Sequence, residues 1–308
     1  MKVFVTGVNG QLGHDCMNEL IKRGHEAIGS DIQGQNIAGS TAQDQTGAAG
    51  QSAYIQLDIT DRDAVLTAIE EIHPDLIIHC AAWTAVDAAE DEENQPKVHA
   101  INADGTRNIA EAARAADAKI IYISTDYVFD GQGERPWQPD DKNYAPLNVY
   151  GKTKLEGELA VSGLLEKYFI VRIAWVFGVN GKNFIKTMLN VGKNHDTVRV
   201  VNDQIGTPTY TYDLARLLVD MGETDRYGYY HATNEGGFIS WYDFTCEIYR
   251  QAGMATKVIP VTTEEYGLSV AARPFNSRLD RSKLLCEGFE PLPEWQDAVA
   301  RYLKEAAL

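Results

Sequence analysis

A tyrosine and a lysine, Tyr150 and Lys154, stand four residues apart at the start of a predicted helix. Four residues make about one helical turn, so the two side chains lie on the same face of the helix. An ammonium group close to a phenol favours the phenolate and lowers the tyrosine pKa from its usual value of about 10. The pair therefore has the chemistry of a proton donor. Taken alone, the spacing is common, and a surface tyrosine beside a solvated lysine is the other interpretation.

A hydroxyl group is expected next to this pair. The apolar run 119–123 predicts a buried strand, and Ser124 and Thr125 follow it directly. Ligands bind at the carboxyl ends of the strands of an open parallel sheet. From there a hydroxyl can hydrogen-bond both a substrate carbonyl and the phenol of Tyr150. Thr125, Tyr150 and Lys154 are therefore the predicted catalytic residues.

Three glycines near the start of the chain give the strongest physical signal. Residues 2–6 predict a buried strand, residues 15–23 an amphipathic helix, and Gly7, Gly10 and Gly13 lie between them. Glycines at these positions allow a tight turn, a close approach of the backbone to a pyrophosphate, and close packing of helix on strand. The helix N-terminus also offers free N–H groups to phosphates. This context predicts a dinucleotide site.

Acidic and small side chains at later strand ends extend the predicted site. Asp31 ends the second predicted strand, where a carboxylate can accept hydrogen bonds from the adenosine ribose. Its charge disfavours a 2′-phosphate and so favours NADH, although a nearby arginine would admit NADPH; an ordinary turn residue is the alternative. Asp58 is expected to hold the adenine amine. Ala81 and Ala82 would let the dinucleotide lie against the backbone.

Alternating strands and helices predict a doubly wound parallel sheet of the Rossmann type with a smaller, sequence-discontinuous C-terminal substrate domain. We expect residues 1–178 to form the dinucleotide-binding domain, with a returning segment near 206–232, and residues 179–308 to form mainly the substrate domain. Residues 32–52, rich in Gln, Gly, Ala and Ser, predict a loop beside the adenine site.

A long helical segment is predicted over residues 93–116. Asn102 lies within it. Its amide is either a satisfied core group or a support for the catalytic helix.

The composition limits the class of protein. Of 308 residues, 44% are hydrophobic and 23% are charged, which is typical of a globular chain. No run approaches the roughly 20 apolar residues that a spanning helix needs, and the first residues lead directly into a strand, so we expect a cytoplasmic protein without a membrane partner. A net charge of −16 argues against a nucleic-acid partner. The four cysteines lack metal-type spacing, and no metal site is predicted.

These features together resemble the extended short-chain dehydrogenase/reductase family. Four longer segments resemble, more specifically, the dTDP-4-dehydrorhamnose reductases: residues 80–90, 124–131, 150–154 and 201–209. The resemblance covers essentially the whole chain. The resemblance implies NAD(P)H-dependent reduction of the C4 ketone of dTDP-4-dehydro-6-deoxy-L-mannose to dTDP-L-rhamnose. That reaction belongs to dTDP-rhamnose biosynthesis, which supplies cell-surface polysaccharide.

The same resemblance implies a role for each residue. Tyr150 would give a proton to the new alkoxide, Lys154 would lower the Tyr150 pKa and hold the nicotinamide ribose, and Thr125 would orient the carbonyl. The residues implied for NADPH or NADH are Gly7, Gly10, Gln11, Leu12, Gly13, Asp31, Asp58, Ile59, Ala81, Ala82, Trp83, Tyr150 and Lys154. Those expected for the substrate are Thr125, Asp126, Trp175, Asn183 and Arg273, the last for the diphosphate because arginine suits phosphate.

Alternatives stay open at this stage. A different sugar-nucleotide reductase or an epimerase would share the fold, and a non-catalytic NAD(P)-binding regulatory subunit resembles the same family. A dehydratase is disfavoured, because those enzymes carry Asp-Glu after the threonine and here the second position is Tyr127. Some family members are metal-bridged dimers. Asp15 and Glu294 could match two of the acids, but the position near Tyr212 is not acidic, so a monomer or a homodimer is expected.

Overall fold

The computed structural model describes residues 1–34 and 52–307. Most of the predicted loop 32–52 therefore lies outside the described residues, and nothing tests its placement beside the adenine site.

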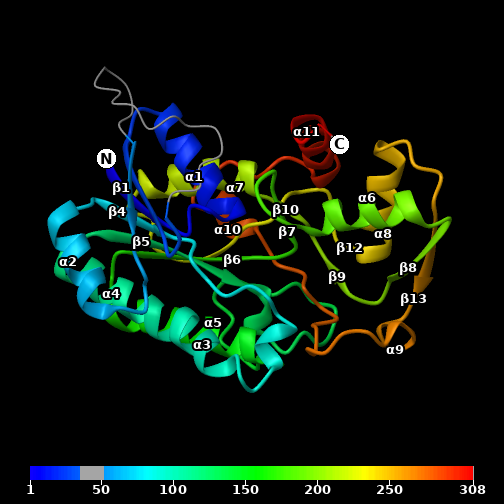
Figure 1. Cartoon of the computed structure of the whole chain (residues 1–308), viewed down its shortest axis with the longest axis horizontal. Coiled ribbons are helices and arrows are strands. Elements are labelled where there is room, and N and C mark those ends of the chain that lie inside the picture. The colour runs from blue at the N-terminus through cyan, green and yellow to red at the C-terminus, as the bar shows by residue number, and fades with distance from the viewer. Residues whose placement is uncertain (35–51, 308) are drawn as a thin grey trace.

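A parallel sheet of seven strands forms the larger half of the molecule (Figure 1). Its order is β11-β6-β5-β4-β1-β2-β3, and each neighbouring pair runs in the same direction. The strands are β1 (Lys2–Thr6), β2 (Glu26–Asp31), β3 (Ser52–Gln56), β4 (Leu76–His79), β5 (Lys119–Thr125), β6 (Tyr168–Ile173) and β11 (Gly228–His231). The order reverses between β1 and β4, which is where such sheets bind ligands. The predicted doubly wound sheet is confirmed.

Helices cover both faces of this sheet (Figure 1). One face carries α1 (Gln11–Lys22), α7 (Thr211–Gly222) and α10 (Ser282–Cys286), and the other carries α2 (Arg62–Ile72), α4 (Thr106–Ala115) and α5 (Val149–Leu164). Successive strand residues point to opposite faces. Val3 and Val5 therefore pack in the core under α1, while Phe4 packs in the core under α2. Strands buried on both faces explain the continuous apolar runs of the sequence.

The segment predicted to be helical over residues 93–116 is helical from 95 to 115, but it is not α-helical throughout. The structure has α3 (Gln95–His99), a π-helical segment η2 (Ala100–Gly105) and then α4. Asn102 lies fully buried in the π-helical segment, where its side-chain oxygen accepts the Trp83 N–H at 2.8 Å and its amide donates to Thr153 at 3.1 Å. Because Thr153 belongs to α5, Asn102 supports the catalytic helix.

The smaller half packs three helices against a parallel strand pair. The helices are α6 (Phe184–Asn194), α8 (Trp241–Gln251) and α11 (Trp295–Glu305), and the pair is β8 (Thr197–Val201) with β13 (Lys257–Val261), followed by α9 (Thr263–Tyr266). Short pairs join the halves: β7 (Val176–Phe177) with β10 (Thr209–Tyr210), and β9 (Ile205–Gly206) with β12 (Ile239–Ser240). Single turns η1 (Ala88–Glu90) and η3 (Asp126–Val128) complete the elements.

The chain crosses between the halves more than once, since α7 and β11 return to the sheet after β10. None of the helices in the described ranges is both long and apolar enough to cross a membrane.

Candidate active site

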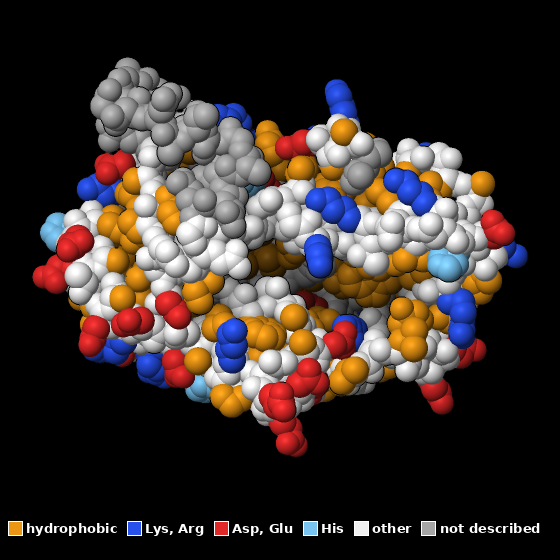
Figure 2. Space-filling model, viewed as in Figure 1, with side chains coloured by type: hydrophobic (Ala, Val, Ile, Leu, Met, Phe, Trp, Pro, Cys, Tyr) orange, Lys and Arg blue, Asp and Glu red, His pale blue; other side chains and the backbone are white. Residues whose placement is uncertain are grey.

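A cavity of about 840 Å³ opens between the two halves, at the carboxyl ends of the central strands. Figure 2 shows it as a hollow in the middle of one face, with hydrophobic side chains in its depth and blue cationic side chains at its upper rim. Its wall includes the ends of β1, β2, β4, β5 and β6, the start of α5, and the loop after β7. The strand reversal between β1 and β4 lies at its centre, so its position follows from the topology.

Most of the predicted site residues line this cavity. They are Thr125, Tyr150 and Lys154; Gly7, Gly10, Gln11, Leu12, Gly13, Asp31, Asp58, Ile59, Ala81 and Ala82; and Asp126 and Trp175. Trp83, Asn183 and Arg273 do not line it.

The glycine turn (residues 7–13) has the geometry that a bound pyrophosphate requires. Gly7 has φ +72°, and a Cβ there would lie 2.7 Å from the Ala81 backbone nitrogen. A Cβ on Gly13 would collide with the Gly7 carbonyl oxygen. Gly10, the N-cap of α1, makes no side-chain cap hydrogen bond, so the N–H groups of the first turn keep their bonding capacity for an anion. The turn therefore fits a dinucleotide.

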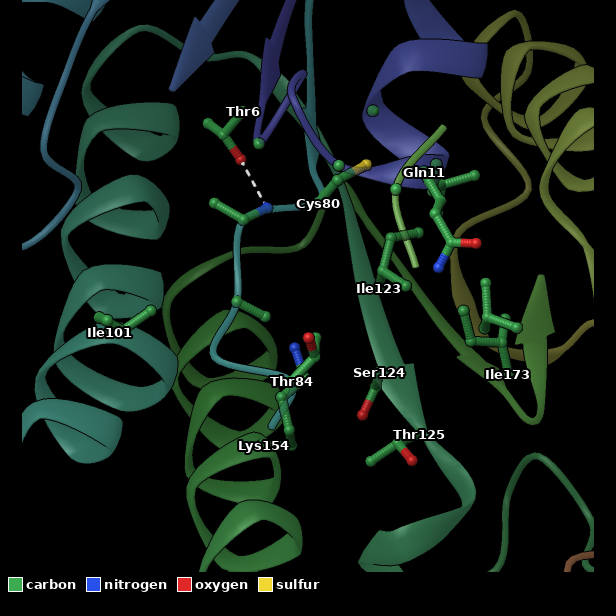
Figure 3. Close-up of a pocket in the computed structure, with 18 of the residues that line it drawn as sticks. Thr6, Gln11, Cys80, Thr84, Ile101, Ile123, Ser124, Thr125, Lys154 and Ile173 are labelled. Atoms are coloured by element: carbon green, nitrogen blue, oxygen red, sulfur yellow. Dashed lines mark hydrogen bonds between the residues drawn. The ribbon is translucent and has the colours of Figure 1, made fainter. Parts of the chain in front are cut away.

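Hydrogen bonds hold the neighbouring strand ends against this turn. The Ala81 N–H donates to Thr6 Oγ1 at 3.1 Å, the dashed line in Figure 3. The Asn9 N–H, within the turn, donates to Asp31 Oδ2 at 3.1 Å at the end of β2. Asp31 thus lies at the cavity edge nearest to the glycine turn, where a ribose of a dinucleotide would lie.

The three predicted catalytic residues meet at the end of β5. Figure 3 shows Ser124 and Thr125 on the strand end and Lys154 on the neighbouring helix, across the cavity from them. The helix α5 begins here because Asn148 caps it, accepting the Gly151 N–H at 2.7 Å. This cap places Tyr150 in the first turn of α5, where it lines the same cavity as Thr125.

The pKa of Tyr150 differs from the prediction. Burial raises the pKa of Tyr150, the Asp126 carboxylate raises it further, and the hydrogen bond with Thr125 lowers it. The expected lowering by Lys154 is wrong for this structure. Burial also lowers the pKa of Lys154, to about 7, with Glu158 and Cys80 acting in the opposite direction. A lysine that is charged only part of the time at neutral pH has less effect on a phenol.

Two buried polar atoms face the cavity without a partner among the described residues. Ser124 and Asp126 are each only 2% exposed, yet Ser124 Oγ and Asp126 Oδ2 make no hydrogen bond there. The other oxygen of Asp126 accepts from Thr125 Oγ1 at 3.0 Å. Burial raises the pKa of Asp126 to about 6. Both groups line the cavity, so they are suited to bind polar groups of a substrate.

The cavity wall includes residues outside the predicted set, among them Trp241 and Lys182. Trp241, at the start of α8, lines the wall beside Trp175, with ring centroids 3.8 Å apart. No local pattern signals this contact between residues far apart in the sequence. Lys182 also lines the wall, and among the described lining residues it and Lys154 are the cations. Its signal in the sequence was its own charge, because in a protein of charge −16 Lys182 is one of the cations in the second half of the chain that could meet a diphosphate.

Asn183 and Arg273, predicted to bind substrate, are engaged elsewhere. Asn183 caps α6, accepting the Lys186 N–H at 3.0 Å and donating to the Gly178 carbonyl at 2.7 Å. It therefore shapes the loop that carries Lys182. Arg273 donates two hydrogen bonds to Asp87, at 2.9 and 2.7 Å. Their substrate roles stay predictions.

Two further residues lie away from the cavity wall. The backbone of Trp83 is held by Asn102, and its indole N–H donates to the Ala85 carbonyl at 3.0 Å, so its cofactor role also stays a prediction. Asp15 is buried and accepts a hydrogen bond from Thr211 Oγ1. In residues 1–34 and 52–307, no group of three or more His, Cys, Asp or Glu side chains is arranged to hold a metal.

Comparison with known proteins agrees with this geometry. The family model described as RmlD substrate binding domain matches residues 1–308. The dTDP-4-dehydrorhamnose reductase of Aggregatibacter actinomycetemcomitans is 38% identical, over 97% of each chain.

Two solved structures are similar over nearly the whole chain. The crystal structure of a dTDP-4-dehydrorhamnose reductase from Clostridium acetobutylicum has a TM-score of 0.86 at 40% identity and covers 100% of both chains. That of the Bacillus anthracis reductase, in complex with NADP, has a TM-score of 0.86 at 39% identity and covers 99% of this chain and 100% of that one. The resemblance found in the motifs is thereby confirmed, and the chain belongs to the dTDP-4-dehydrorhamnose reductase family.

Proposed function

We propose that this chain reduces the C4 ketone of dTDP-4-dehydro-6-deoxy-L-mannose to dTDP-L-rhamnose with NADPH or NADH, in dTDP-rhamnose biosynthesis. The observation that carries the proposal is the meeting of Thr125, Tyr150 and Lys154 in the same cavity as the glycine turn. The names of the relatives support the substrate, and the Bacillus anthracis complex with NADP supports the class of cofactor.

The protonation state of Tyr150 suits proton donation. When bound, the nicotinamide cofactor supplies the hydride that reduces the ketone. A phenol with a raised pKa carries its proton at neutral pH, which is the state that a donor needs. Thr125 would orient the carbonyl through its hydroxyl. As the ketone oxygen gains negative charge, the Tyr150 proton moves to it, and the Thr125 hydroxyl would stabilise the tyrosinate that remains. Lys154 would hold the nicotinamide ribose.

The substrate end of the cavity has groups for each part of a sugar nucleotide. Ser124 Oγ and Asp126 Oδ2, which lack partners among the described residues, would hydrogen-bond sugar hydroxyls. Trp175 would pack on the sugar. Lys182 would bind the diphosphate, because in a protein of net charge −16 an anionic group needs a local cation. Arg273 would also bind the diphosphate if its side chain left Asp87.

Asp31 bears on the choice of cofactor. Its carboxylate at the end of β2 would accept hydrogen bonds from the adenosine ribose hydroxyls. We propose that the rest of the dinucleotide is contacted by the glycine turn, Asp58, Ile59, Ala81, Ala82 and Trp83.

We also propose that the enzyme acts in the cytoplasm, as a monomer or a homodimer. Size-exclusion chromatography with light scattering measures the oligomeric state.

The test is the oxidation of NADPH, and separately of NADH, followed at the absorbance band of the reduced nicotinamide. Freshly generated dTDP-4-dehydrorhamnose starts the reaction, and the product is compared with authentic dTDP-L-rhamnose. The expected result is one cofactor oxidised for each dTDP-L-rhamnose formed. Isomerisation of the sugar without added cofactor would indicate an epimerase. No oxidation with either cofactor, together with tight binding to another enzyme, would indicate a regulatory subunit.

A further inference from the structure

The ammonium of Lys154 is buried over an aromatic ring. Lys154 is only 3% exposed, and its Nζ lies 4.1 Å from the centroid of the Tyr122 ring. The carboxylate one turn further along α5, Glu158, pairs with Arg172 at 2.7 Å instead. An aromatic face attracts a cation within about 6 Å, and more strongly when water is excluded. The Tyr122 ring is therefore the group in direct contact with the buried charge.

The position of the ring is fixed by its contact with the same helix. Tyr122 is fully buried in β5, and its hydroxyl donates to the main-chain carbonyl of Lys154 at 3.2 Å. A Cβ at Gly157 would collide with the Tyr122 hydroxyl oxygen. The glycine thus lets α5 pack directly on the edge of the ring. The Tyr122 ring and the backbone of Lys154 are therefore held at a fixed distance. This restricts the positions that the Lys154 ammonium can take.

His79 supports the ring from the adjacent strand. It is the register partner of Tyr122 between β4 and β5, and the two rings stack with centroids 5.7 Å apart. The hydroxyl of Thr106 donates to the Asn102 carbonyl, so its oxygen accepts from His79 Nε2 at 3.1 Å, and His79 Nδ1 accepts from Thr6 at 2.7 Å. Both ring nitrogens are satisfied by a neutral imidazole. Burial lowers the pKa of His79 to about 3, so no second positive charge forms beside Lys154.

We infer that Tyr122 is a positioning residue, whose ring face holds the Lys154 ammonium at the cavity wall and keeps it charged. The titratable groups around Lys154 are Tyr150 and Glu158 on its own helix, Tyr122 on β5, and His79 and Cys80 at the end of β4. Burial brings the pKa of Lys154 to about 7, so a further fall on removal of the ring would leave a smaller fraction of Lys154 charged at neutral pH. The effect of the Lys154 charge on the reaction rests on the proposed function, whereas the contact between Lys154 and the Tyr122 ring does not.

A direct test measures the titration of Lys154 without any ligand. The full chain is labelled with lysine carrying ¹³C at Cε, and the Lys154 signal is assigned by its loss in Lys154→Met. In Tyr122→Phe, which keeps the ring, the titration midpoint should stay near that of the wild type. In Tyr122→Leu it should fall by about one pH unit. An unchanged midpoint in a folded Tyr122→Leu protein would overturn the inference.

Two controls separate the ring from general damage. Phe169→Leu also replaces a buried aromatic ring by leucine, but on β6 and in the core on the other face of the sheet. It should leave the titration midpoint of Lys154 unchanged. If Tyr122→Leu does not fold, phenylalanines with two and then three ring fluorines are placed at position 122. Fluorine weakens the negative ring face with little change in shape, so the midpoint should fall stepwise. A constant midpoint in that series would equally refute the role of the ring.

Activity provides a second measurement. With NADPH and the keto sugar, the high-pH limb of kcat/KM should move to lower pH in Tyr122→Leu by the same amount as the NMR midpoint, and Tyr122→Phe should restore it. A wild-type protein with no reductase activity would refute the proposed function and leave the NMR test intact. A wild-type pH profile in folded Tyr122→Leu would refute the inference alone.

Discussion

The indole of Trp241 lies flat on that of Trp175, with ring centroids 3.8 Å apart and planes inclined by 16°. Trp175 has a left-handed backbone, with φ 51°, which is costly for a residue with a Cβ and persists only where packing enforces it. Gly206 packs so closely that a Cβ there would lie 2.9 Å from a ring atom of Trp175. Together, Trp241 and Gly206 fix the Trp175 ring in the cavity wall.

Trp241→Ala should therefore raise KM for the sugar nucleotide about tenfold while kcat changes less. An aromatic pair contributes roughly 0.5–1.5 kcal/mol beyond its buried area, and about 1.4 kcal/mol corresponds to a factor of ten. Steady-state kinetics at saturating NADPH measures both constants. Trp241→Phe keeps a stacked ring and is the matched control. A folded Trp241→Ala enzyme with the wild-type KM would show that the stack does not position Trp175 for binding.

Tyr150→Phe should lower turnover by roughly 10²–10⁴, because the variant loses the proton that the ketone oxygen receives. The ring and its edge-on contact with Tyr127, at 5.7 Å between centroids, are retained, so affinity for NADPH should stay close to that of the wild type. Stopped-flow turnover and fluorescence titration of NADPH test the two parts. A collapse of cofactor affinity in this variant would assign Tyr150 to binding instead of proton transfer.

Asp31→Ala should weaken NADH binding more than NADPH binding. The carboxylate would accept hydrogen bonds from both adenosine ribose hydroxyls of NADH, whereas it would repel the 2′-phosphate of NADPH. Its loss therefore removes an attraction to NADH but a repulsion of NADPH. Titration of each reduced cofactor measures the two dissociation constants. Asp63→Ala is the control, since its side chain is 96% exposed. Equal losses for the two cofactors would exclude a ribose role for Asp31.

Asp15→Asn should change how stability depends on pH. Burial raises the pKa of Asp15 from 3.8 to about 6, so the folded protein keeps a proton that the unfolded chain has released. The free energy of unfolding therefore falls as the pH rises from about 4 to about 6, by up to about 3 kcal/mol. Asparagine has no such proton and should make the protein more stable than wild type at pH 7, with little difference at pH 4.

Urea unfolding at pH 4, 5, 6 and 7 measures this dependence. The exposed Asp196 offers a matched control in Asp196→Asn, which should leave the profile unchanged. A constant difference between Asp15→Asn and wild type at all four pH values would mean that folding does not shift the pKa of Asp15.

Much of the fold and of the cofactor site could be predicted because their signals are local. Gly7, Gly10 and Gly13 lie close together in the sequence, between a predicted strand and a predicted helix, and this local pattern is enough to predict a dinucleotide turn. The same holds for Tyr150 and Lys154, whose shared helix face follows from a spacing of four residues. The alternation of apolar runs and helices likewise determined the parallel sheet, and with it the end of the sheet at which ligands bind.

Only the tertiary structure decided the environment of those residues. The raised pKa of Tyr150 comes from burial and from Asp126, and desolvation depends on packing by the whole chain. The stack of Trp175 on Trp241 joins residues from different elements. Arg273 is held by Asp87, and Lys182 lines the cavity in its place. Spacing along a chain fixes which neighbours share a face, whereas contacts between distant segments and their exclusion of water are set only when the chain packs.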